Sequence, residues 1–233
     1  MKYHLICGYK RSGKDTFFTK LSNLKDITID ENLDPSQCQD LKPHFTILCK
    51  PDYIDSNFCF YKNNLIRMAM ADMVKEEIHE YFKLNFTSKI CAELAKEHLT
   101  FYDEETMVYR SLRSYYIEHA MKMRKINPDH WCNKAYVNLL MSDTIQNGHE
   151  NNDVVITDWR FKNERLFFEK VGEVKSYRIF RKEADDENFF DESEHELDKE
   201  ITDFLVVSSA EDVVYAKKRF PQYEDYKLMF KIL

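Results

Sequence analysis

The sequence predicts one α/β domain, in which a mostly parallel sheet is covered by helices on both faces. Short apolar runs rich in β-branched and aromatic residues alternate with segments whose apolar residues recur at helical spacing. A glycine-containing turn joins the first apolar run to the first helical segment, as in a strand–loop–helix unit. The 233 residues, 43% hydrophobic and 32% charged, are enough for one sizeable core.

Strands and helices alternate along most of the chain. The expected strands are Tyr3–Cys7, Asn64–Ala71, Asp153–Thr157, Val174–Phe180 and Asp203–Val207. The expected helices are Lys14–Leu24, Asp72–Lys83, Ser88–Leu99, Glu104–Lys125, a helix entered at Pro128 that runs through Leu140, Asn163–Lys170 and Ala210–Arg219.

Two segments interrupt this alternation. Residues 25–63 hold three of the five prolines, and they predict an irregular insertion with one or two short strands such as His44–Leu48. Residues 181–200 are dominated by charge and predict a lid or loop. We expect both to belong to a single domain that spans residues 1–233.

Composition excludes several classes of protein. The formal net charge of −7 argues against a broad nucleic-acid-binding surface. No apolar run approaches the roughly 20 residues of a membrane span, so no membrane partner is expected. The six cysteines include no Cys-x-x-Cys pair, which argues against a zinc site or a disulfide framework and favours a reducing, cytoplasmic compartment.

The strongest motif is the run Gly8-Tyr-Lys-Arg-Ser-Gly13-Lys14-Asp15-Thr16, which has the P-loop spacing G-x-x-x-x-G-K between a strand and a helix. Glycines permit backbone conformations in which successive N–H groups converge on phosphate oxygens, and the helix N-terminus adds its positive dipole. Lys14 would reach the β- and γ-phosphates. We therefore expect a nucleoside triphosphate to bind at the positions Gly8, Lys10, Arg11, Ser12, Gly13, Lys14, Asp15 and Thr16.

One position departs from the usual motif. Asp15 stands where a Ser or Thr hydroxyl normally binds magnesium, and Thr16 follows it. Asp15 would ligate the metal directly, ligate it through water, or accept a proton from the attacking group. These alternatives stay open at the level of sequence.

A second motif, Val154-Val-Ile-Thr-Asp158-Trp-Arg160, places a carboxylate at the end of a buried strand. In a parallel sheet this end borders the ligand crevice. Asp158 would organise magnesium or its waters, and Arg160 would hold a phosphoryl group. The alternative is a capping Asp beside a surface Arg.

Further arginines are candidate phosphate ligands. Arg110 and Arg113 would share one helix face, with Arg124 three turns along, and together they would receive the acceptor's phosphate. A solvated helix face explains the same pattern. Arg178 and Arg181 precede the charged segment and suit a lid over the transferring phosphates, with His195 as a possible base.

Together these residues resemble the deoxynucleoside monophosphate kinase family of phages and large DNA viruses. The resemblance rests on Gly8-x-Lys-Arg-Ser-Gly13-Lys14-Asp15-Thr16, Ile156-Thr-Asp158-x-Arg160-Phe161-x-Asn163-Glu164, Ser193-Glu194-x-Glu-Leu197-Asp198 and Asn127-Pro128-Asp129-His130-Trp131. It covers roughly residues 1–20 and 64–215. A sister family, the animal-type phosphomevalonate kinases, shares much of this pattern, but Thr16 and Phe161-x-Asn163-Glu164 favour the nucleotide kinase.

The resemblance implies a nucleoside monophosphate kinase fold with a short lid, ATP as donor, Mg²⁺ as cofactor and a deoxynucleoside 5′-monophosphate as acceptor. Lys14, Asp15, Asp158 and Arg160 would be catalytic, with Asp15 or Asp158 at the metal. The acceptor would contact Arg110, Arg113, Arg124, Trp131 and Glu194. A homodimer and a location in the host cytoplasm, if the chain is viral, follow by the same likeness. A phosphomevalonate or other small-molecule kinase, or a non-catalytic nucleotide-binding viral protein, remain the alternatives.

Overall fold

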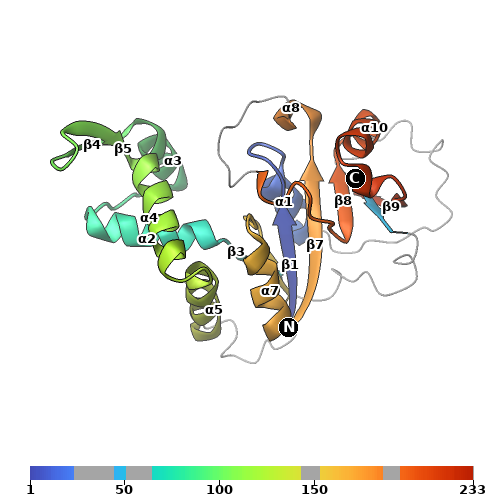
Figure 1. Ribbon diagram of the computed structural model, residues 1–233, viewed down its shortest axis with the longest axis horizontal. Helices are drawn as coiled ribbons and strands as arrows, with labels where there is room; N and C mark the ends of the chain where they lie inside the picture. The colour runs from blue at the N-terminus through green and yellow to red at the C-terminus, as the bar shows by residue number, and fades with distance from the viewer. Residues whose placement is uncertain (24–44, 51–64, 143–152, 186–194, 233) are drawn as a thin grey trace. The chain divides into compact units, whose positions relative to one another are not determined.

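The chain forms two compact units. The computed structural model describes residues 1–23, 45–50, 65–142, 153–185 and 195–232. The sheet unit comprises residues 1–68 and 147–233, and the helical unit comprises residues 69–146. Figure 1 shows their elements, and we describe each unit by itself.

The sheet unit contains a sheet of seven described strands in the order β3-β6-β1-β7-β8-β2-β9. The strands are β1 (Lys2–Cys7), β2 (Phe45–Cys49), β3 (Leu65–Met68), β6 (Asp153–Ile156), β7 (Glu173–Phe180), β8 (Phe204–Val207) and β9 (Lys227–Ile232). All neighbouring strands pair in parallel except β2, which is antiparallel to both β8 and β9. The expected α/β architecture with a mostly parallel sheet is confirmed.

Helices cover both faces of this sheet (Figure 1). They are α1 (Lys14–Asn23), α7 (Lys162–Val171), the short α8 (Lys182–Asp185), α10 (Ala210–Arg219) and the 3-10 turn η3 (Pro221–Tyr223). On one face, Phe17 and Leu21 of α1 pack in a buried cluster with Ile6 of β1. On the other face, the ring of Phe168 in α7 lies 5.0 Å from that of Tyr3, and Ala216 of α10 is buried beside Phe180.

The central position of β1 determines which loops meet. β1 lies between β6 and β7, parallel to both. The residues after β1, β6 and β7 therefore emerge at the same edge of the sheet, where the strand order reverses. Ligands of open α/β sheets bind at such an edge.

The helical unit consists of α2 (Met70–Tyr81), α3 (Lys89–His98), α4 (Leu112–Ile126), α5 (His130–Met141) and a hairpin of β4 (Thr100–Asp103) and β5 (Val108–Ser111). Helix α4 packs against α2, α3 and α5. Its core includes Val74, Ile78, Leu112 and the fully buried Trp131. Ser88 and Ser111 cap α3 and α4, since their hydroxyls accept the amides of Cys91 and Ser114.

The expectation of one helix over Glu104–Lys125 was wrong for residues 104–111. Oδ1 of Asp103 accepts the amides of Glu105 and Thr106 at 3.0 and 3.3 Å, and Met107 has a φ of 58°. This side-chain-closed turn competes with the helix and starts the β4–β5 hairpin instead. Consequently Arg110 lies in β5 and Arg113 in α4, so the two do not share a helix face.

The antiparallel part of the sheet, formed by β2 and β9, was only partly predicted from the sequence. The expected short strand near His44–Leu48 is present as β2, at Phe45–Cys49, but it is an interior strand of the sheet. β9 was not predicted at all. The rest of the expected insertion, residues 24–44 and 51–64, lies outside the described residues.

Candidate phosphate-binding site

The glycine loop, residues 8–16, begins directly after β1 and ends in the first turn of α1. Gly8 has a φ of 147° and Gly13 a φ of 98°, while Arg11 between them has a φ of 66°. A Cβ on Gly8 would lie 2.4 Å from the carbonyl oxygen of Ile179 in β7. Glycine is therefore required at position 8 by both conformation and space.

The ammonium group of Lys14 lies over this loop. Its Nζ donates hydrogen bonds to the carbonyl oxygens of Gly8 at 2.6 Å and Tyr9 at 2.8 Å. The Tyr9 carbonyl also accepts the amide of Ser12 at 3.1 Å, which closes the turn. The loop thus carries its cation at the N-terminal end of α1, where the helix dipole also favours an anion.

A buried hydroxyl in the loop further suits a polyanionic ligand. Ser12 is 2% exposed, and its Oγ has no hydrogen-bond partner among the described residues. Buried polar atoms without partners are uncommon and frequently mark a ligand site. The cradle of three positive-φ residues, the lysine and this hydroxyl together fit the phosphate groups of a nucleotide.

The carboxylate of Asp15 projects from the first turn of α1 and is 73% exposed at the side chain. Its Oδ1 lies 3.5 Å from Nη2 of Arg67, in β3. Within the described part of the chain, no three or more His, Cys, Asp or Glu side chains form a metal-binding group. Magnesium commonly uses one or two carboxylates together with waters and substrate phosphates, so one exposed carboxylate fits that ion.

The turn after β6 lies beside the end of β1. The amide of Trp159 donates to the carbonyl of Ile6 at 3.2 Å. Asp158 and Arg160, on either side of Trp159, are half-buried. This turn therefore brings both predicted residues to the same sheet edge as the glycine loop, as the sequence suggested.

Glu164 gives the Phe161-x-Asn163-Glu164 motif a structural role. It is fully buried, and its Oε2 accepts the amides of Arg160 at 2.9 Å and Phe161 at 3.3 Å. These bonds cap the first turn of α7 and fix the backbone of Arg160. The carboxylate therefore helps to hold the turn that carries Asp158.

Arg178 and Arg181 occupy very different surroundings. Arg178 is a buried residue of β7 whose Nε donates to the hydroxyl of Tyr223 at 2.9 Å and whose Nη2 donates to the carbonyl of Leu197. Arg181 follows β7, is exposed, and pairs with Glu183 at 3.1 Å. Of the two arginines, only Arg181 thus lies in the segment expected to form a lid.

The charge of Arg178 is retained despite burial. Burial opposes the charged form, but the hydrogen bond to Tyr223 and the attraction of Asp198 favour it, and the pKa of Arg178 is raised. Burial likewise raises the pKa of the Cys7 thiol, against the attraction of Arg178 and Lys14, so this cysteine remains protonated.

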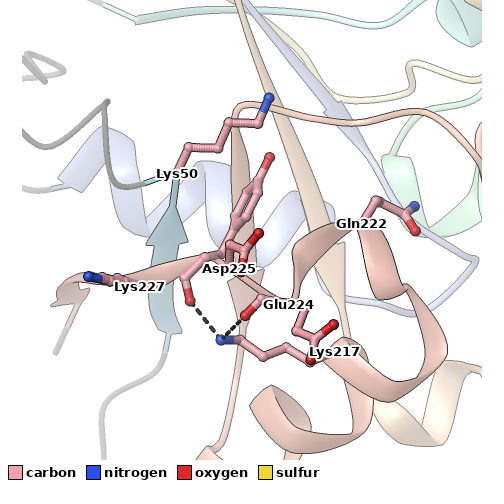
Figure 2. A pocket seen from close by; sticks show the side chains of 7 residues that line it. Lys50, Lys217, Gln222, Glu224, Asp225 and Lys227 are labelled. Carbon is pink, nitrogen blue, oxygen red and sulfur yellow. Dashed lines mark hydrogen bonds between the residues drawn. The ribbon is translucent and has the colours of Figure 1, made fainter.

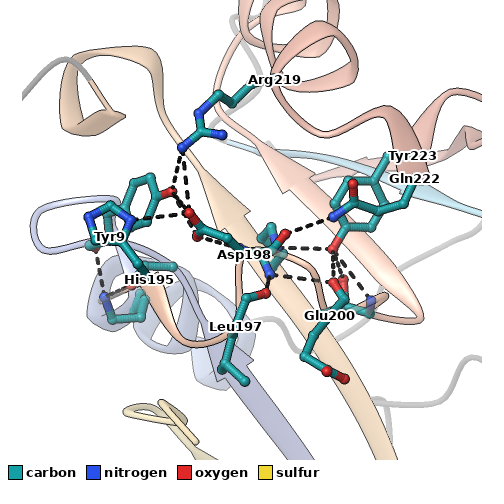
Figure 3. Close-up of polar contacts among 12 residues, drawn as sticks. Tyr9, His195, Leu197, Asp198, Glu200, Arg219, Gln222 and Tyr223 are labelled. Atoms are coloured by element: carbon teal, nitrogen blue, oxygen red, sulfur yellow. Dashed lines mark hydrogen bonds and ion pairs between the residues drawn. The ribbon is translucent and has the colours of Figure 1, made fainter. Parts of the chain in front are cut away.

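A polar cluster joins the glycine loop to two later segments (Figure 3). The hydroxyl of Tyr9 donates to both carboxylate oxygens of Asp198, at 2.8 and 2.9 Å. Nδ1 of His195 lies 3.1 Å from Oδ2 of Asp198, and Nη2 of Arg219 lies 3.2 Å from the Tyr9 hydroxyl. Glu194, the neighbouring predicted residue, lies outside the described residues.

The arginines expected at the acceptor site are paired within the helical unit. Nη1 of Arg110 donates to Asp103 at 3.0 Å, Nη2 donates to Glu118, and the guanidinium lies 4.6 Å from the ring centre of Tyr115. Nη1 of Arg113 lies 3.3 Å from Oε1 of Glu97. Both guanidinium groups thus pair with carboxylates of the helical unit itself.

The other two acceptor candidates of the helical unit differ in access. Arg124 is half-buried in the last turn of α4, eleven residues or about 16 Å along the helix axis from Arg113. Trp131 is fully buried, and its indole N–H donates to the carbonyl of Ala120 at 3.1 Å. Its ring therefore presents no open face to a base.

Two cavities are lined by residues outside the glycine loop. One of about 670 Å³ is lined by Lys50, Lys217, Gln222, Glu224, Asp225, Tyr226 and Lys227 (Figure 2). Because Cys49 pairs with the first residue of β8, Phe204, this cavity lies at the edge of the sheet opposite the loop. It is therefore not part of the candidate phosphate site.

The other cavity, of about 530 Å³, lies in the helical unit between α2 and α4. It is lined by Glu77, Ile78, Glu80, Tyr81, Tyr115, Glu118, His119 and Lys122. Burial raises the pKa of Glu77, but hydrogen bonds from Lys134 and His119 outweigh it and lower the pKa below its usual value. The carboxylate is therefore charged at neutral pH.

Comparison with known proteins adds no assignment, because no protein-family model and no curated protein sequence matches the chain. Within the described part of the chain, every helix is too short or too polar to span a lipid bilayer.

Proposed function

We propose that the protein transfers the γ-phosphoryl group of ATP to a deoxynucleoside 5′-monophosphate, with Mg²⁺ as the cofactor. The observation that carries the proposal is the glycine loop, in which Gly8, Gly13 and Lys14 form a cradle at the N-terminus of α1. The motif wording, which resembles the viral and phage kinases, supplies the acceptor class.

The position of the loop in the sheet supports nucleotide binding. The loop follows the central strand β1, and Asp158 follows the adjacent β6 at the same edge. An anion at this edge gains from the helix dipole, the loop amides and the Lys14 ammonium. Other α/β proteins place phosphates in the same topological position.

In the proposed reaction an acceptor phosphate oxygen attacks the γ-phosphorus of ATP, and the bond to the β–γ bridging oxygen breaks to release ADP. Lys14 would leave the carbonyls of Gly8 and Tyr9 to neutralise the β- and γ-phosphates. Asp15 or Asp158 would hold magnesium, which supplies charge neutralisation when bound. Arg160 and Arg181 are the candidate cations for the transferred group, and Arg113 is the candidate for the acceptor.

A coupled ADP-release assay tests the proposal, with dTMP, dGMP, dCMP, dAMP and phosphomevalonate as separate acceptors. We expect turnover with at least one deoxynucleotide that depends on Mg²⁺. Turnover with phosphomevalonate alone would identify the sister activity instead. Tight ATP binding without turnover on any acceptor would support a non-catalytic nucleotide-binding protein.

Lys14→Ala tests the loop itself. We expect transfer to fall at least about a hundredfold while the melting temperature stays near that of the native protein, because the ammonium stabilises transition-state charge. Lys20→Ala, in the last turn of the same helix, is the matched control and should retain activity. Activity that survives Lys14→Ala would refute the assignment of the loop.

A further inference from the structure

The hydroxyl of Tyr9 and the carboxylate of Asp198 join residues that are 189 positions apart. Tyr9 is 6% exposed, and its ring lies 5.2 Å from that of His195. Asp198 receives this hydroxyl on both oxygens, at 2.8 and 2.9 Å. A hydrogen bond to a charged, partly buried acceptor contributes more than one between neutral groups.

Tyr9 also organises the backbone of the glycine loop. Its carbonyl oxygen accepts Nζ of Lys14 at 2.8 Å and the amide of Ser12 at 3.1 Å. The backbone of Tyr9 therefore holds both the turn and the ammonium group of Lys14, and the side chain of Tyr9 holds that backbone from outside the loop. Loss of the side-chain contact with Asp198 would therefore remove one restraint on the backbone of Tyr9, and with it on the position of that carbonyl.

Asp198 is itself held from several sides (Figure 3). Nδ1 of His195 lies 3.1 Å and Nη2 of Arg219 lies 3.5 Å from Oδ2, while Nη1 of Arg178 lies 3.9 Å from Oδ1. Gln222 donates to the backbone carbonyl of Asp198 at 2.9 Å. The carboxylate is thus contacted by His195, by Arg178 of β7 and by Arg219 at the end of α10, while Gln222 of η3 holds the backbone.

We infer that Asp198 is a positioning residue of the phosphate site, which holds the glycine loop and Lys14 in their binding geometry through the hydroxyl of Tyr9. It acts from outside the loop, at the end of the chain segment that follows β7. The inference rests on the proposed nucleotide site, but the order it ascribes to the loop is measurable without any nucleotide.

The test compares Tyr9→Phe, Asp198→Ala and the double variant with the native protein. Amide hydrogen exchange of the free protein is measured at Ser12, because its amide is bonded to the Tyr9 carbonyl. We expect exchange at Ser12 to accelerate about tenfold in each single variant, the loss expected for one hydrogen bond to a charged group. The double variant should exchange no faster than Asp198→Ala, because that change already removes the bond that Tyr9→Phe removes.

A second measurement is the dissociation constant of MgATP from each variant. We expect it to rise about tenfold in Tyr9→Phe and Asp198→Ala, with a smaller change in kcat. Asp198→Asn, which keeps an acceptor oxygen for the tyrosine, should restore most of the protection at Ser12.

Tyr226→Phe is the matched control. Tyr226 belongs to the same buried cluster as Tyr9, but its hydroxyl donates to the carbonyl of Thr202 rather than to Asp198. We expect it to change the melting temperature without changing exchange at Ser12. Unchanged Ser12 exchange in Tyr9→Phe and Asp198→Ala, or equal acceleration in Tyr226→Phe, would overturn the inference. Failure of the native protein to bind ATP would refute the proposed function. The exchange at Ser12 would then still decide whether Asp198 orders the glycine loop.

Discussion

The carboxylate of Asp15 lies 3.5 Å from the guanidinium of Arg67. Arg67 belongs to β3, which is separated by β6 from β1, the strand that leads into the glycine loop. Asp15 occupies the loop position at which a hydroxyl usually binds magnesium. The positive charge of Arg67 compensates the extra negative charge of Asp15 beside the candidate phosphate site. We interpret the pair as the means by which this loop accommodates an acidic residue.

Replacement of Asp15 by Asn tests its part in metal binding. If Asp15 ligates the ion or its waters, the Mg²⁺ concentration for half-maximal turnover should rise about tenfold at saturating ATP, and excess Mg²⁺ should restore much of kcat. Arg67→Ala should have the opposite effect on Mg²⁺ demand, because it leaves the carboxylate without its positive neighbour. An effect of Asp158→Asn alone would assign the metal to Asp158.

Substitution of the two loop glycines by alanine should separate strain from steric conflict. Gly8 and Gly13 both have positive φ angles, but only at Gly8 would a Cβ meet backbone, the Ile179 oxygen at 2.4 Å. We expect Gly8→Ala to lower the free energy of unfolding by about 3 kcal/mol and Gly13→Ala by about 1 kcal/mol. Urea unfolding measures both, and equal losses would contradict the steric argument.

Removal of Arg113 should act on the acceptor and not on the donor. We expect Arg113→Ala to raise the acceptor KM roughly tenfold, with the ATP dissociation constant nearly unchanged, because one charge-assisted contact is lost. Glu97→Gln is the control, since it breaks the 3.3 Å ion pair while keeping the arginine. If Glu97→Gln raises the acceptor KM equally, Arg113 serves the fold of the helical unit.

Acid should destabilise the sheet unit through His4. This histidine is 2% exposed and lies 3.2 Å from Asp153 and 3.1 Å from the hydroxyl of Tyr177. Burial lowers the pKa of His4 below 6.5, although Asp153 acts in the opposite direction. Below pH 6.5 the unfolded chain therefore binds a proton that the folded protein does not, and the free energy of unfolding falls as the pH decreases toward the folded pKa.

The slope from this one proton is at most about 1.4 kcal/mol per pH unit, and it vanishes above the unfolded pKa. Urea titrations between pH 5 and pH 8, in roughly half-unit steps, measure it. His4→Asn should reduce the slope, and His79→Asn should account for a further part, because burial also lowers the pKa of His79. A slope unchanged in His4→Asn would refute this assignment.

Local patterns predicted much of the sheet because its determinants are local. The buried β-branched run at Asp153–Ile156 becomes β6, and the G-x-x-x-x-G-K spacing becomes a loop with positive φ at both glycines. The hairpin at residues 100–111 was missed because one side chain, Asp103, closes the turn in a region of helical periodicity.

The parts of the candidate site that could not be predicted depend on distant residues. Arg67 reaches Asp15 across 52 positions, and Asp198 reaches Tyr9 across 189. No spacing rule relates such pairs, and their contact could be predicted only if the strand order were already known. The burial of Trp131 likewise follows from the packing of α5 in the helical unit. The residues around Trp131 in the sequence would fit an exposed, base-binding tryptophan equally well.

The interior position of β2 has a consequence for how the chain can be shortened. Residues 25–63 were predicted to form an irregular insertion, yet Phe45–Cys49 separates β8 from β9 and supplies Phe45 to the core beside α1. Excision of the whole excursion would split the sheet and expose the hydrogen-bonding edge of β8, a template for association with other chains. A minimal domain of this protein must therefore keep β2 and shorten only the segments on either side of it.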